Sequence, residues 1–504
     1  MPSRSCPTAR WTGCGSRRWP PNPRPRRAAT HPWRSHDTRR IPVEHHPVPR
    51  DPGVPPRGLD LRPEGQPLRP GRAGVVRPAA PGRAHRADAG QPRGPEVPPQ
   101  RGLLHARLHV RRLRRLQGGR VRSLEFMSTD YLENPWPLYA HFRREQPIWW
   151  SDEIRMHCVF RYEHVQAILK DPRFTVEFPF RITEELFGRT LIDMEGPEHL
   201  RLRRKVAPLV GNANLAIFAR EVSEPRITAL VRAAAEQPPM EFMRAIAERV
   251  PTLMISEFLG FPLEDERWLF ERMMVLMDHL DGKRGNRQEV SDVHHEVSAW
   301  LDGIIARLLE EGPGTRGFKR LIDGIRDETP ETIKILYWTF LAGGIETSMC
   351  LLGNAATVLA RNPSWFEQLA TVPGMARAIL DEVLRFEPVQ ASTVRFAAET
   401  LELGGVTIKR GQAVNLLLAS AARDEATFAS PDVFDPTRTL SNSLSFAVGP
   451  HACVGKTFTM MNAEITLRTL WNTWQGVQLA EDAPAVIRGA SFRKPHALFL
   501  KAKH

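Results

Sequence analysis

A long apolar stretch, residues 330–361, constrains the fold of this 504-residue chain more than any other feature. Thr329 can cap a helix that has Pro330 in its first position, and Asn362-Pro363 can end it. A helix of about 32 residues extends for about 48 Å. Because its apolar residues occur nearly all round, we expect neighbouring elements to bury it.

The middle of this helix contains residues that a buried helix normally avoids. Gly343 and Gly344 are adjacent, and each costs about 1 kcal/mol relative to alanine in a helix. Glu346 and Thr347 follow them and add a carboxylate and a hydroxyl to an apolar setting. One interpretation is a helix crossing that needs small residues, with Glu346 paired elsewhere. The other interpretation is a functional site.

A second unusual stretch, residues 446–455, places a single cysteine between glycines. Gly449 and Gly455 bracket Cys453, and His451 lies two residues before it. Glycine lets the backbone approach a ligand closely and supplies φ values that other residues resist. Most lone cysteines are buried structural residues. A loop that exposes several N–H groups around one sulfur, however, suits a thiolate.

The run from Phe446 to Gly455 resembles the haem-binding loop of the cytochrome P450 monooxygenases, whose usual pattern is Phe-Gly-x-Gly-x-His-x-Cys-x-Gly. The chain departs from this pattern at Ala447. The resemblance implies that Cys453 is the axial thiolate of haem iron, a ligand that favours O–O cleavage. It also implies that Phe446, His451 and Gly455 belong to the haem site.

Residues 342–348 resemble the oxygen-activation motif of the same family. In that family the glycines open the helix beside the iron, so the resemblance implies that Gly343 lies against the haem. It also implies that Thr347 and Glu346 manage protons, because proton delivery needs positioned donors.

Further residues match the family's contacts to the haem propionates. His199 and Arg203 lie four residues apart in a predicted helix and therefore share one face. Without the resemblance, a solvated basic helix would be the favoured interpretation. Arg395 matches the family's second propionate arginine, and a guanidinium fork suits a carboxylate. The resemblance adds His451 from its place in the loop.

A structural motif of the family, Glu-x-x-Arg, matches Glu382 and Arg385, on a helix that Pro388 ends. On a surface such a pair contributes little to stability. The resemblance implies instead a buried pair beneath the haem that helps to form the cysteine loop. It implies that Arg438, from the meander before that loop, joins the pair.

The resemblance covers about residues 127–504 and implies a mainly α fold with a small β region. In this fold a long central helix lies over haem b and the cysteine loop lies beneath it. The implied reaction inserts one oxygen atom from O₂ into a small organic substrate. Electrons from NAD(P)H arrive through a separate ferredoxin with its reductase, or through a flavodoxin-like partner. Candidates for an apolar substrate pocket, which are equally often core residues, are Phe178, Phe180, Phe187, Thr339 and Ala342.

Other functions stay open at this point. An enzyme of this fold can use peroxide or catalyse a rearrangement, although the presence of Glu346 and Thr347 favours O₂ activation. A haem-binding sensor or a nucleic-acid-binding protein is the alternative that the basic N-terminal region suggests. The rest of the chain is net acidic and lacks a basic recognition helix, so we expect no nucleic-acid partner.

Residues 1–126 differ from the rest of the chain in composition. They contain 27 Arg, no Lys, 8 acidic residues and 22 of the 44 Pro. Their net charge of +19 leaves −6 for the rest of a chain whose formal charge is +13. Three interpretations compete: a disordered tail, an Arg-rich transit peptide, and an out-of-frame or mis-assigned start. We favour the last, with Met127 as a natural start, because an Arg/Pro/Gly/Ala mixture without lysine is typical of GC-rich DNA translated out of frame.

The cysteines are scattered and include no Cys-x-x-Cys pair, so they indicate neither a disulfide framework nor a zinc site. No unbroken apolar run reaches the roughly 18 residues that a membrane span needs. The first residues lack the apolar core of a signal peptide. These features predict a cytoplasmic protein without a membrane anchor.

Overall fold

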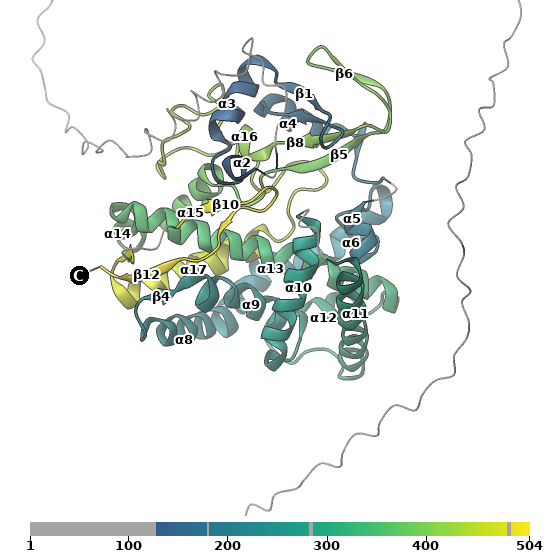
Figure 1. Cartoon of the computed structure of the whole chain (residues 1–504). Helices are drawn as coiled ribbons and strands as arrows, with labels where there is room; N and C mark the ends of the chain where they lie inside the picture. The colour runs from purple at the N-terminus through teal and green to yellow at the C-terminus, as the bar shows by residue number, and fades with distance from the viewer. Residues whose placement is uncertain (1–125, 127, 179–180, 282–285, 481–484, 504) are drawn as a thin grey trace, which may run out of the picture. The chain divides into compact units, whose positions relative to one another are not determined.

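Helix α13 (Pro330–Arg361) runs through the centre of the helical part of the structure (Figure 1). The computed structural model describes residues 126, 128–178, 181–281, 286–480 and 485–503. All of them lie within one unit of the chain, Glu96–His504. The predicted N-terminal extension, residues 1–126, lies outside the described residues apart from Phe126.

The predicted bounds of α13 are confirmed. The Thr329 side chain accepts a hydrogen bond from the Thr332 amide, and Pro330 occupies the first turn. The helix is long and apolar enough to cross a membrane by length and composition alone. Its most apolar window is 72% buried inside the protein, as in a core helix.

Helices make up most of the described chain. In order they are α2 (Thr129–Glu133), α3 (Trp136–Glu145), α4 (Tyr162–Lys170), α5 (Ile182–Phe187), α6 (Gly196–Val206), α7 (Asn212–Phe218), α8 (Glu224–Ala235), α9 (Arg249–Leu259), α10 (Glu266–Leu280), α11 (Arg287–Glu310), α12 (Leu321–Ile325), α13, α14 (Pro363–Thr371), α15 (Met375–Phe386), α16 (Leu418–Ala421) and α17 (Lys456–Trp474). Short 3₁₀ or π segments are η1 (Ala207–Val210), η2 (Ala219–Ser223), η3 (Met243–Ala247) and η4 (Leu263–Asp265).

The largest sheet has the strand order β1-β2-β8-β5-β3. Its strands are β1 (Ile148–Ser151), β2 (Met156–Val159), β3 (Phe174–Thr175), β5 (Thr393–Ala397) and β8 (Ala413–Leu416). Strands β2 and β8 pair in parallel, with Val159 opposite Leu416, and the other pairs are antiparallel. A three-stranded sheet has the order β4 (Met240–Glu241), β12 (Phe499–Ala502) and β9 (Val477–Leu479). Two further sheets have two strands each. One pairs β6 (Leu401–Leu403) with β7 (Val406–Ile408), and the other pairs β10 (Ile487–Arg488) with β11 (Lys494–Pro495).

Residues 401–419 contribute to two different sheets. Strands β6 and β7 form a separate hairpin. Strand β8 joins the largest sheet because it pairs with β5 and β2. The chain then turns into the short helix α16.

Figure 1 shows a helical part and a part that contains the largest sheet. The buried apolar residues of the described chain form a large cluster, a second layer that includes the largest sheet, and a smaller cluster around Phe142 and Phe160. Helix α4 illustrates how the sequence produces the second layer. Its Tyr162, Val165, Ile168 and Leu169 are spaced along one face, and all four are buried in a cluster that includes Val414 of β8. The helical cluster surrounds α13.

Candidate haem site

The cysteine loop, residues 446–455, is held by its own backbone. The Cys453 amide donates to the Phe446 carbonyl at 2.8 Å, and the Ala452 amide donates to the Gly449 carbonyl at 3.1 Å. Gly449 has a φ of +82° and Ala447 a φ of +53°. The second value explains why the family usually has glycine where this chain has alanine.

Gly455 does not supply an unusual backbone conformation. Its φ is −83°, an ordinary value, and it is the N-cap of α17. A Cβ at this position would lie 3.9 Å from Cys453 Sγ, an ordinary contact distance.

The Cys453 side chain is exposed, yet protein surrounds it closely enough that burial raises the pKa of its thiol. The two observations agree if the sulfur borders an enclosed space. The Gly455 and Lys456 amides and the Arg203 guanidinium act in the opposite direction and lower the pKa of the thiol. The two amides at the N-terminus of α17 and the guanidinium from α6 are suited to stabilising a thiolate.

Helix α13 contacts α17 directly after the loop. Ser348 Oγ of α13 lies 3.1 Å from Thr459 Oγ1 of α17. Gly343 is exposed within this otherwise buried helix, and a Cβ on it would meet no atom within 4 Å. Thr347, one turn later, donates its hydroxyl to the Gly343 carbonyl at 2.7 Å.

The two adjacent glycines of α13, Gly343 and Gly344, thus differ in function. A Cβ on Gly344 would lie 2.8 Å from Ile255 Cδ1 of α9, so Gly344 permits helix packing. The helix-crossing interpretation therefore holds for Gly344. Gly343 instead opens onto space, as a site residue would.

Basic groups surround the cysteine loop. Arg203 donates to the Ala452 carbonyl, and the ring of His199 stacks on His451 with centroids 4.5 Å apart. Burial, together with the neighbouring His451 and Arg203, lowers the pKa of His199 to about 4. Arg395 is 7% exposed, and burial lowers the pKa of its guanidinium to about 10.

Glu195 is a residue that the sequence did not single out. Its carboxylate lies 3.2 Å from His451 Nε2, and it is also an electrostatic neighbour of His199 and Arg395. Burial opposes ionisation of Glu195, but the contact with His451 and the hydrogen bond from the Val176 amide leave its pKa below the ordinary value. Glu195 thus connects the histidines to Arg395.

The residues present fit an anionic group with two carboxylates. Within the described ranges, no carboxylate forms an ion pair with Arg203 or Arg395, which donate only to carbonyls and to the Thr393 hydroxyl. His199 Nε2 is buried without a hydrogen-bond partner. Buried charges are normally paired, so these groups are arranged to receive negative charge. Haem, with two propionates and an iron that takes a thiolate ligand, has this chemistry.

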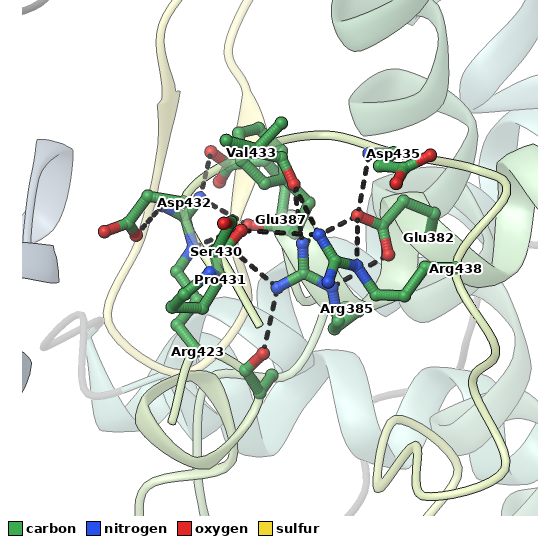
Figure 2. A network of polar contacts seen from close by, with 12 residues as sticks. Glu382, Arg385, Glu387, Arg423, Ser430, Pro431, Asp432, Val433, Asp435 and Arg438 are labelled. Atoms are coloured by element: carbon green, nitrogen blue, oxygen red, sulfur yellow. Dashed lines mark hydrogen bonds and ion pairs between the residues drawn. The ribbon is translucent and has the colours of Figure 1, made fainter. Parts of the chain in front are cut away.

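A network of polar contacts includes Glu382 and Arg385 of α15 (Figure 2). Both side chains are fully buried and form two hydrogen bonds, at 2.6 and 2.8 Å. Arg385 also donates to the carbonyls of residues 422, 431 and 433. Arg438 Nε lies 3.5 Å from Glu382 Oε1 without hydrogen-bond geometry. Ser445, directly before the loop, donates to the Leu384 carbonyl at 3.1 Å, so the network supports the loop.

Glu346 has a partner that no local pattern indicated. It is 2% exposed and forms an ion pair with Lys494 of β11. The two residues are 148 positions apart in sequence.

The candidate pocket residues have mixed surroundings. Phe187 is 2% exposed and packs on Trp338 at 5.2 Å, and Thr339 bonds to the Ile335 carbonyl and the Leu191 amide. Ala342 is buried, and Phe178 stacks on Phe396 with centroids 4.0 Å apart. Phe180 lies outside the described residues. A surface cavity of about 330 Å³ near the ends of α9 and α11 is lined by none of these residues.

Two cations of α6 form ion pairs within the chain. Arg201 pairs with Glu198 and Glu328, and Lys205 pairs with Asp327 and Glu328. Their side chains stay partly exposed, at 45% and 26%.

Comparisons with known proteins agree with this geometry. A sequence model described as Cytochrome P450 matches residues 374–479. The chain is 31% identical over 377 residues to an epothilone C/D epoxidase of Sorangium cellulosum, an alignment that covers 70% of this chain and 88% of the epoxidase. It is 29% identical to a mycinamicin VIII C21 methyl hydroxylase of Micromonospora griseorubida, covering 69% of this chain and 91% of that enzyme.

Among solved structures, epothilone D-bound cytochrome P450epoK matches with a TM-score of 0.69 and 27% identity. That match covers 76% of this chain and 100% of the other. The fold, a mainly helical structure with a small β region, is therefore the one expected from the motifs. Sequence identity, coverage and fold together show that this chain belongs to the cytochrome P450 family of monooxygenases.

Proposed function

We propose that the chain is a haem-thiolate monooxygenase that inserts one oxygen atom from O₂ into a small apolar organic molecule. Cys453 ligates the iron of haem b in this proposal. The supporting observation is the position of the exposed Cys453 thiol beside Arg203, within the same electrostatic cluster as Arg395. No carboxylate of the described chain pairs with either guanidinium.

Each basic group has a proposed task. Arg203 and Arg395 bind the propionates, with His199 and His451 as further donors, and Phe446 and Gly455 border the ring. The bound haem supplies the activation of O₂ and the transfer of oxygen to the substrate. Glu382, Arg385 and Arg438 hold the loop and take no part in the chemistry.

The proposed proton-handling groups are Thr347 and Glu346. The Thr347 hydroxyl is already positioned by the Gly343 carbonyl, and Glu346 is an ionisable group in a dry part of α13. A positioned donor accelerates proton transfer by about 10² to 10⁴-fold. These two residues favour the use of O₂ over peroxide chemistry or a rearrangement.

We propose a substrate of the secondary-metabolite class, because similar proteins are named for the oxidation of epothilone and mycinamicin. Phe178, Phe187, Thr339 and Ala342 are proposed to border it. Electrons are proposed to come from NAD(P)H through a separate ferredoxin or flavodoxin-like protein, in the cytoplasm. The proposed catalytic domain begins near residue 127.

The test is a carbon monoxide difference spectrum of the reduced, haem-loaded full chain. We expect the red-shifted Soret band of a thiolate-ligated haem, and its loss in Cys453→Ser with haem still bound. Cys350→Ser, at a buried cysteine of α13, is the matched control and should keep the band. A wild-type spectrum without the shifted band would reject the proposal.

A further inference from the structure

The ion pair between Glu346 and Lys494 joins the middle of α13 to the β10–β11 hairpin. The Glu346 side chain is 2% exposed and that of Lys494 is 19% exposed. Burying both charges has a large desolvation cost, which close pairing offsets. Replacing either side chain by an uncharged one therefore leaves the other charge desolvated without this ion pair.

The face of α13 that carries Glu346 is shaped to receive this hairpin. Gly353 is seven residues later, nearly two full turns, and lies on the same face. A Cβ on Gly353 would lie 2.6 Å from Met243 Sδ of η3 and 3.1 Å from Cδ of Pro495, the neighbour of Lys494. Cys350 lies between Glu346 and Gly353, and it is an electrostatic neighbour of Lys494. The small residue lets both η3 and β11 approach α13 closely.

The backbone before Lys494 is fixed on both sides. Asn354 of α13 donates from Nδ2 to the Arg493 carbonyl at 3.0 Å. The Arg493 amide donates to the Val389 carbonyl at 2.9 Å, and the Arg493 side chain is 1% exposed. Because its preceding residue cannot shift, Lys494 is held over Glu346 by the fold and not only by the attraction of the two charges.

The same hairpin is bonded to the end of α10. The Ser491 amide donates to Asp281 Oδ1 at 2.9 Å, and Asp281 is the C-cap of α10. The charged or ionisable groups that face Lys494 are Glu346 and Cys350 from α13 and Asp278 from α10. Burial lowers the pKa of Lys494, but these neighbours outweigh burial and leave its pKa above the ordinary value.

We propose that Lys494 is a positioning residue for Glu346, which it keeps ionised and directed toward the hairpin, ready to accept and pass on a proton. This inference rests on the function proposed above, in which Glu346 handles protons. The Ser491–Asp281 bond makes the end of α10 part of the same assembly. A displacement of that helix end would therefore change the position of Lys494 relative to the Glu346 carboxylate.

The direct test is infrared difference spectroscopy of the full chain, which detects protonated carboxyl groups. In Lys494→Met the buried Glu346 carboxylate loses its cation and should take up a proton at neutral pH. We expect a new protonated-carboxyl band in Lys494→Met that is absent from wild type and from the double variant with Glu346→Gln. Lys494→Arg keeps a cation and should show no such band.

A matched control comes from the same hairpin. Arg488 is the register partner of Lys494, but it lies near Glu133 at the surface. Arg488→Met should leave the carboxyl spectrum unchanged. If Lys494→Met does not fold, Lys494→Gln carries the same expectation with a polar head group retained.

The second measurement is product formed per NAD(P)H consumed, as a function of pH. We expect Lys494→Met to lower this ratio by about tenfold, less than the 10²-fold or more that a proton-transfer group contributes. The pH profile should also shift, which a purely structural role would not cause. A folded Lys494→Met with the wild-type carboxyl spectrum would overturn the inference. Absence of the thiolate-haem band would instead reject the proposed function and leave the infrared result standing.

Discussion

The Cα of Gly449 faces the carbonyl oxygen of Leu169 so closely that a Cβ on Gly449 would lie 2.5 Å from that oxygen. The carbonyl belongs to the backbone of α4, which cannot turn aside as a side chain could. The cysteine loop therefore packs against α4 only because this position has no side chain.

Gly449→Ala should lower the free energy of unfolding by about 3 kcal/mol, because it combines a backbone clash with a positive φ. Urea unfolding of the full chain checks this value. Gly405→Ala is the matched control: Gly405 has a φ of +78°, but a Cβ there meets nothing within 4 Å. The control should cost about 1 kcal/mol. Equal losses at both positions would show that the contact with Leu169 does not matter.

Glu382→Gln should lower the free energy of unfolding by about 3 kcal/mol, because it leaves the buried Arg385 charge without its partner. The Glu382→Gln variant should also lose haem during gel filtration. The Asp381–Arg377 pair lies on the same helix but is partly exposed, so Asp381→Asn should cost less than about 0.5 kcal/mol. A similar cost for both variants would contradict the role of burial.

Ala447→Gly should stabilise the protein by about 1 kcal/mol, because glycine adopts the φ of +53° at this position without steric cost. Thermal unfolding measures the change. Ala452 lies in the same loop but is not among the residues with a positive φ. Ala452→Gly should therefore lower the free energy of unfolding by about 0.5 kcal/mol, because glycine only raises the conformational entropy of the unfolded chain. The prediction is that Ala447→Gly raises the free energy of unfolding and Ala452→Gly lowers it.

His294 makes stability depend on pH. It stacks on Trp338 between α11 and α13, and burial, with His295 and Lys334 nearby, lowers its pKa. The unfolded chain then binds a proton more readily than the folded chain, so stability should fall as pH decreases through about 6.5. Unfolding midpoints at pH 7.5 and pH 5.5, each about one unit from that value, should differ less in His294→Gln than in wild type. An unchanged difference would exclude His294 as its source.

Thr347→Ala should reduce product formed per NAD(P)H by at least about tenfold while changing stability by under about 1 kcal/mol, because the hydroxyl makes only a local bond to Gly343. Thr347→Ser should restore most of the yield. Ser348 provides the control, because its hydroxyl faces Thr459 of α17 instead. If Ser348→Ala uncouples the reaction as strongly, the assignment to Thr347 fails.

The elements with strong local signals were predicted from sequence. Thr329, Pro330 and Pro363 define both ends of α13 because capping and proline chemistry act within a few residues. The cysteine loop and the Glu382–Arg385 pair were recognisable for the same reason, since each motif lies within one short segment. The catalytic role of the loop and the supporting role of the pair stay predictions.

Contacts between distant segments could not be predicted in this way. Lys494 reaches Glu346 because the β10–β11 hairpin packs on α13, and nothing near either residue encodes that approach. Arg201 and Lys205 both pair with Glu328, which lies 127 and 123 residues later in the sequence. Glu195 could not be identified from sequence for the same reason. It lies beside His451 and is an electrostatic neighbour of Arg395 only after the start of α6, the cysteine loop and β5 come together.

The arrangement of Arg203 and Arg395 has a consequence for producing this protein in cells. Two desolvated guanidinium groups without a carboxylate partner in the described chain weaken the fold until a dianionic ligand binds, and ligand binding to the native state alone raises its stability by mass action. The amount of intact enzyme should then follow the porphyrin supply of the host. Cells grown without a haem precursor should accumulate less of the chain because proteases remove it, at unchanged messenger RNA levels.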